Sequence, residues 1–349
     1  MKLKGKTKRP AACALSLTLF VGCQSHPPKA KIVGGDMTFQ RGAQLLAAGS
    51  PKSAIPFLTQ TVTSEPDGPE PLALLSLAYA LDLQDQRAIL EAQLVHRPDG
   101  MAPGWEFVAV GIAQMRQNRP HAATLTLQHG ISALDKKNPI EPSARQWLVL
   151  AELLDGKHGE ALQALQPLCA SSKMRTSTML WATLVQAYHG RTHLAPAALE
   201  DCAQSVVSDS GQSALKRDLT GADDQMLYDA GVASIAAGNF DTARKLFAHL
   251  QQKSPNSSDG AIWLAMISGV NGDWSSTRSQ LKDACEKGSP TSRGLANQLF
   301  SVVCALEDRP DAMIEHLLAG QRSLGRSKMP VHPVDEPNAD KVWVSDGFH

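Results

Sequence analysis

Two histidines, His189 and His193, stand four residues apart, a spacing that can place two imidazoles on one face of a helix around a metal ion. Gly190 lies between them, and glycine at that point favours the end of a helix. We therefore expect a solvated loop here, and the sequence predicts neither a metal ion nor another cofactor. His121 and His129 are expected on the surface.

Catalytic motifs are missing from the sequence. It has no nucleophile-elbow serine, no glycine loop that cradles phosphate and no His-Glu-x-x-His motif. The acidic residues are scattered along expected helices, as on solvated faces. We therefore predict that the protein is not an enzyme and that it has no catalytic residues.

The six cysteines divide by position. Cys13 lies in the N-terminal apolar run, and Cys23 follows it. Cys169, Cys202, Cys285 and Cys304 lie in the body of the chain. If the chain is exported, these four cysteines lie in an oxidising compartment. The two candidate disulfides are Cys169–Cys202 and Cys285–Cys304, but sequence alone does not set disulfide geometry. The favoured alternative is four buried free thiols.

The N-terminus has the layout of a secretory signal: five basic residues before position 10, then a short apolar run to Gly22. Its end, Leu19-Phe20-Val21-Gly22-Cys23, resembles a bacterial lipobox. The resemblance implies cleavage after residue 22 and acyl chains such as palmitate on Cys23, with residues 23–34 as a tether. Gln24 resembles the residue that directs lipoproteins to the outer membrane. The alternative is an ordinary signal peptide that happens to contain a cysteine.

The mature chain is mildly acidic. Without the five bases of residues 1–22, 29 Lys and Arg remain against 34 Asp and Glu, a formal charge of −5. The sequence also lacks a basic stripe, so we do not expect nucleic acid as a partner. The expected partners are envelope proteins, and the membrane through the N-terminal lipid.

Residues 223–256 predict two short helices with a tight turn at Gly238 and a stop at Pro255. The stretch resembles a tetratricopeptide repeat (TPR). In that family a small residue in each helix lets the pair cross closely, and Gly231 and Ala243 match those positions. Phe240 and Phe247 match the aromatic positions.

The small residue of the second helix recurs along the chain with gaps of 34, 34, 39, 36, 46, 34 and 35 residues: Ala54, Ala88, Ala122, Ala161, Ala197, Ala243, Thr277 and Ala312. The resemblance implies an all-α, TPR-like solenoid of about eight helical hairpins. We expect an N-terminal array over 35–205, a break or hinge over the Ser- and Gly-rich residues 206–223, a C-terminal array over 224–325 and an extended tail over 326–349.

In TPR proteins the first helices line a concave groove, and the resemblance implies a partner-binding groove of mainly apolar and neutral residues. Mapping each unit gives this set: Phe107, Met115, Gln146, Gln186, His189, Tyr228, Val232, Ile262 and Met266. Such a groove would take an apolar or amphipathic segment. The alternative is a tightly wound superhelix with no open groove.

Three function classes follow. The favoured one is a non-catalytic envelope adaptor or assembly scaffold, in a specific version a pilotin-like protein for a pilus or secretion system. A cell-wall-related enzyme or enzyme regulator is the second, and a structural periplasmic spacer is the third.

Overall fold

The computed structural model describes residues 34–95, 104–134, 141–170, 174–190, 221–255 and 259–326. Within these ranges all regular structure is helical, as the sequence predicted. The first array contains α1 (Gly34–Ala47), α2 (Pro51–Ser64), α3 (Pro69–Leu81), α4 (Asp85–Leu94), α5 (Trp105–Arg116), α6 (Pro120–Ala133), α7 (Glu141–Leu154), α8 (His158–Leu165), the 3₁₀ helix η1 (Gln166–Ala170) and α9 (Arg175–Tyr188). The second contains α12 (Asp224–Ala236), α13 (Phe240–Lys253), α14 (Asp259–Val270), α15 (Trp274–Lys287), α16 (Pro290–Leu306) and α17 (Pro310–Arg326).

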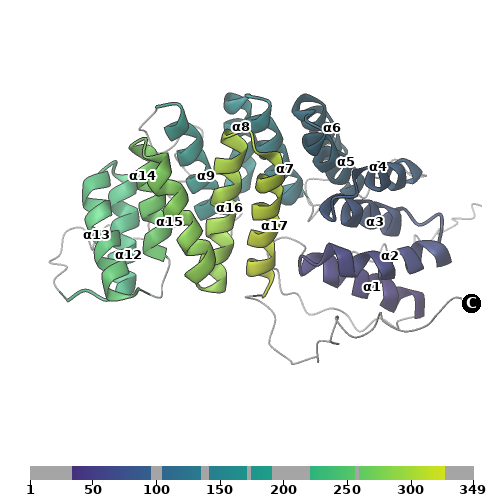
Figure 1. Cartoon of the computed structure of the whole chain (residues 1–349), viewed down its shortest axis with the longest axis horizontal. Helices are drawn as coiled ribbons and strands as arrows, with labels where there is room; N and C mark the ends of the chain where they lie inside the picture. The colour runs from purple at the N-terminus through teal and green to yellow at the C-terminus, as the bar shows by residue number, and fades with distance from the viewer. Residues whose placement is uncertain are drawn as a thin grey trace, which may run out of the picture.

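Consecutive helices pair as antiparallel hairpins (Figure 1). Seven complete pairs and α9, the first helix of the fifth unit, lie within the described ranges, in agreement with about eight hairpins. The predicted signal peptide, the tether to residue 33, residues 206–220 of the predicted hinge and the tail from 327 lie outside the described residues.

A left-handed residue marks every described hairpin turn. In these turns the positive φ angles fall at Gly49, Leu83, Asn118, Gly156, Gly190, Gly238, Gly272 and Asp308, and outside them at Gly104 and Gly221. Five residues later, at the fourth position of each described second helix, stands a fully buried residue: Ala54, Ala88, Ala123, Ala161, Ala243, Thr277 and Met313. The predicted ladder is therefore wrong by one residue at Ala122 and Ala312, because α6 and α17 begin at Pro120 and Pro310, one residue later than the ladder assumed. Ala197 lies outside the described residues.

The hairpin at residues 224–253 shows why small residues matter at the crossing. A Cβ built on Gly231 would lie 2.5 Å from Cζ of Phe247, so only glycine lets the two helices approach this closely. Asn239 caps α13 by accepting a hydrogen bond from the backbone N–H of Thr242. Asp241 is the second residue of the helix.

The two arrays form one packed body. α14 packs against α9, α16 against α7 and α9, and α17 against α5. In Figure 1 the C-terminal helices α15 to α17 accordingly run back along α9 and α7 toward the N-terminal hairpins. The largest buried side chains, Trp147, Trp181, Trp263 and Phe247, come from both arrays and belong to one continuous core.

Candidate functional site

The concave face of the solenoid is filled by the chain itself. Six of the predicted groove residues are buried, with exposed fractions of 5% or less: Met115, Gln146, Gln186, Val232, Ile262 and Met266. These six side chains are therefore not presented on an open surface, and α14, α16 and α17 pack against the first helices α9, α7 and α5.

The other three predicted groove residues differ from this set. Phe107 is half-buried, and its ring meets His129 edge-on at a centroid distance of 5.3 Å. Tyr228 is half-buried and packs edge-on against Phe247 and Trp263. His189 is exposed at the end of α9.

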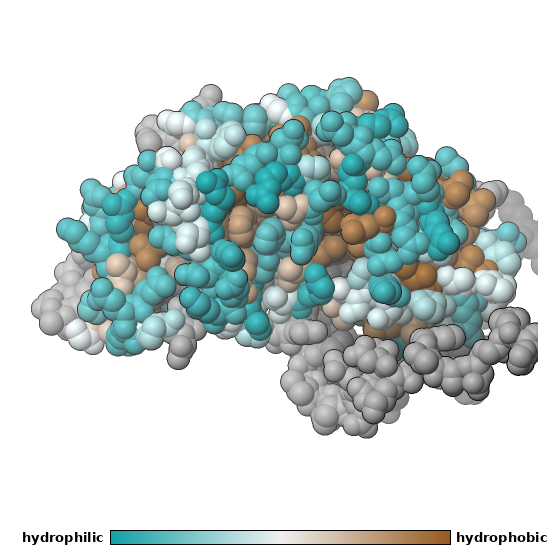
Figure 2. Space-filling model, viewed as in Figure 1, coloured by the Kyte–Doolittle hydropathy of each residue, from teal (hydrophilic) through white to brown (hydrophobic). Residues whose placement is uncertain are grey.

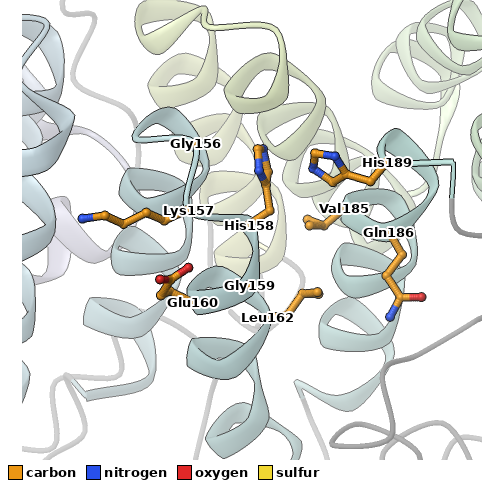
Figure 3. A pocket seen from close by; sticks show the side chains of 9 residues that line it. All are labelled: Gly156, Lys157, His158, Gly159, Glu160, Leu162, Val185, Gln186 and His189. Atoms are coloured by element: carbon orange, nitrogen blue, oxygen red, sulfur yellow. The ribbon is translucent and has the colours of Figure 1, made fainter.

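An open pocket of about 420 Å³ lies between the start of α8 and the end of α9. Two predicted groove residues, Gln186 and His189, line it together with His158, Leu162 and Val185 (Figure 3). α8 is short because Pro167 follows it, and proline lacks the N–H that an α-helix needs at that point.

Two histidine rings stand at the mouth of this pocket. The centroids of His158 and His189 are 4.0 Å apart with an interplanar angle of 67°. Figure 3 shows the two rings side by side above Val185, from opposite helices. Burial lowers the pKa of His158, and the charge of His189 lowers it further. The imidazole of His158 is therefore neutral at pH 7.

Glu152, near the end of α7, is a buried carboxyl group with 2% of its surface exposed. Burial raises its pKa to about 7. Its Oε1 accepts a hydrogen bond from Nε2 of Gln128 at 3.3 Å, while Oε2 has no hydrogen-bond partner in the described structure. Its perturbed pKa follows from this packing between α6 and α7.

The second hairpin carries an apolar outer surface, which we call the α4 leucine face: Leu83, Leu90 and Leu94. Their exposed fractions are 58%, 59% and 53%. Leu90 and Leu94 are one helical turn apart, so they lie on the same side of α4. In Figure 2 hydrophobic surface is visible at the end of the molecule where α4 lies. Leu125 of the neighbouring hairpin, in α6, is 55% exposed.

The cysteines only partly match the favoured prediction. Cys169 is disulfide-bonded, so the expectation of a free thiol is wrong at this position. Cys285 and Cys304 are free thiols, and burial raises their pKa to about 12 and about 11. Cys23 and Cys202 lie outside the described residues.

Sequence reasoning missed two features. It considered His189 only together with His193, which lies outside the described residues, and expected a solvated loop, whereas the fold brings His189 against His158 of the preceding hairpin. The α4 leucine face did leave a signal, since α4 buries only Ala88 while Leu90 and Leu94 lie away from it. In the described ranges no group of three or more His, Cys, Asp or Glu side chains is placed to hold a metal ion. No described helix has the length and apolarity to cross a membrane.

Comparison with known protein families and with curated protein sequences gives no match. Among solved structures, PilW, described as a widely conserved type IV pilus biogenesis factor, is similar with a TM-score of 0.37 and 11% identity over 72% of this chain and 92% of its own. A tetratricopeptide repeat protein from Parabacteroides merdae has a TM-score of 0.33 and 12% identity over 82% of this chain and 98% of its own. A monomeric IFIT1 mutant with Gppp-AAAA has a TM-score of 0.37 and 13% identity over 86% of this chain and 62% of its own. Because these TM-scores are low, the assignment as a TPR-like solenoid rests on the chain's own helix order, turns and buried positions.

Proposed function

We propose that this protein is a non-catalytic adaptor of the bacterial envelope that binds the apolar face of an amphipathic protein segment through the α4 leucine face. The observation that carries the proposal is the exposure of Leu83, Leu90 and Leu94, each more than half exposed, which are three of the six large hydrophobic residues exposed within the described ranges. Clustered exposed apolar side chains of this kind mark interaction sites.

The partner chemistry follows from the geometry of α4. Its two exposed leucines lie one turn apart on a regular helix and present a narrow apolar strip, which suits a partner helix with apolar residues at i and i+4. A buried leucine side chain contributes roughly 1.5–3 kcal/mol of hydrophobic free energy, so two leucines supply a useful anchor.

The location follows from the N-terminus. We propose that cleavage after residue 22 leaves lipidated Cys23 at the outer membrane, with residues 23–34 as a tether whose last eleven residues span about 35 Å when extended. The disulfide on Cys169 fits an oxidising compartment such as the periplasm. A pilotin-like task, in which the bound segment belongs to a pilus or secretion-system component, is the specific version of this role.

The test is capture of partners from the native envelope with the full chain. We expect a Leu90→Ser/Leu94→Ser variant to lose the partners that the wild type retains. The matched control is Lys245→Ser/His249→Ser, an exposed pair at the same i, i+4 spacing on α13. Equal recovery by the two variants contradicts the proposed face. Recovery of cytoplasmic proteins alone contradicts the location, and hydrolysis of cell-wall fragments by the purified chain supports the enzyme alternative.

A further inference from the structure

The two histidines of the α8–α9 pocket come from different hairpins and meet directly. His158 is the first residue of α8, and His189 directly follows α9. Gly190, with φ of +69°, ends that helix in the left-handed conformation. The contact therefore depends on how the fourth and fifth units stack and not on sequence spacing.

Each imidazole can supply one nitrogen to a ligand, because a neutral ring carries one N–H donor and one nitrogen with a free lone pair. His158 and His189 both line the pocket and therefore offer two such nitrogens in one place.

We propose that His158 and His189 bind one divalent transition-metal ion that prefers imidazole, with Cu²⁺ the tightest, and that water completes the coordination. Two imidazoles on one ion at metal–nitrogen distances near 2 Å have ring centroids about 4.5–5 Å apart. The observed 4.0 Å needs only a small outward rotation of the rings, and the pocket has about 420 Å³ of space beside them.

The surroundings favour a cation. Glu160 lines the pocket and interacts electrostatically with His158. Lys157 also lines the pocket, but its Nζ is engaged with Oδ2 of Asp155 at 2.6 Å and with Nδ1 of His121 at 3.0 Å. Gly159 adds no obstruction, since a Cβ built on it meets no atom within 4 Å.

A bound ion would tie α8 to α9 and thereby join the fourth and fifth hairpins. Any ligand that binds the folded chain alone raises its stability by RT ln(1 + [L]/Kd). With two protein ligands we expect a labile site whose affinity falls as the pH drops and the imidazoles take up protons.

The experiment is a Cu²⁺ titration of the full chain by calorimetry, with electron paramagnetic resonance as a second readout. Wild type is expected to bind one Cu²⁺ with hyperfine lines from two nitrogens. His158→Ala and His189→Ala are each expected to weaken binding about tenfold or more. His193→Ala and His249→Ala are the controls and should bind like wild type.

Three results overturn the proposal: binding unchanged in His158→Ala, binding lost in His193→Ala but kept in His158→Ala, or equal weakening in all four variants. Circular dichroism checks that each variant folds. If His158→Ala does not fold, His158→Gln replaces it, and a retained two-nitrogen spectrum in that variant overturns the proposal equally. The metal site and partner binding by the α4 leucine face involve different residues, so failure of one proposal leaves the other standing.

Discussion

Substitution of Gly49 by alanine tests whether α17 closes the solenoid onto the first hairpin. Gly49 lies in the α1–α2 turn with φ of +71°. A Cβ at this position would lie 1.8 Å from Cγ and 2.7 Å from Cδ of Arg322 in α17. Gly238 occupies the equivalent turn position with φ of +74°, and a Cβ there meets nothing within 4 Å. The two glycines thus differ in their contact with another part of the chain.

The magnitudes follow from this difference. Both Gly49→Ala and Gly238→Ala place an alanine in the left-handed region, which costs roughly 1–2 kcal/mol of folding free energy. Only Gly49→Ala also displaces the stem of Arg322, and overpacking of that kind costs about 1–3 kcal/mol. We expect Gly49→Ala to be the more destabilising by at least about 1 kcal/mol. Arg322→Ala should remove that excess.

The assay is urea unfolding followed by circular dichroism, with the four members of the cycle measured together: wild type, Gly49→Ala, Arg322→Ala and the double variant. Gly238→Ala reports the backbone cost alone. Equal losses of stability for Gly49→Ala and Gly238→Ala, or an excess that persists without Arg322, would refute the packing of α17 against the first hairpin.

Three further predictions concern stability and reactivity. Leu83→Gly should raise the unfolding free energy by about 0.5–1 kcal/mol, because leucine at φ of +64° is strained where glycine is not; a lower urea midpoint than wild type would argue against this strain. Glu152 has a raised folded-state pKa of about 7, so the folded chain holds the proton longer than the unfolded chain and stability falls as the pH rises from about 4.5 to 7. Glu152→Gln should reduce the difference in unfolding free energy between pH 5 and pH 8 by up to about 3 kcal/mol, as measured by urea unfolding. The same difference in the variant as in wild type would count against this prediction. The half-buried Cys285 and the buried Cys304 should resist a thiol reagent at pH 8 in the native chain and react after unfolding, since burial raises their pKa to about 12 and about 11; rapid native labelling would contradict these raised pKa values.

The repeat architecture was predictable because its signal is local. A left-handed residue at each turn and a fully buried residue five positions later are set by helix crossing inside one hairpin. The buried residue is small in every described second helix except α17, where it is Met313. The errors at Ala122 and Ala312 also have a local cause, since Pro120 and Pro310 fix where α6 and α17 begin. A proline favours the first turn of a helix, but its presence does not determine which residue of that helix lies at the crossing with its partner helix.

The filled concave face was not predictable in the same way. It depends on α16 meeting α7 and α9, segments that are far apart in the sequence, and no periodicity in one helix reports on such a contact. Apolar first-helix residues such as Ile262 and Met266 suit an open groove and a packed interior equally well. The pairing of His158 with His189 is hidden for the same reason.

Site-specific photo-cross-linking in the native envelope tests the central claim most directly. A benzophenone amino acid replaces Leu90 on the α4 leucine face in one variant and the exposed Lys245 on α13 in another. We expect a discrete cross-linked envelope protein from position 90 and none from position 245. Cross-links from position 245 alone, or from neither position while the partner still co-purifies, would contradict binding through the α4 leucine face.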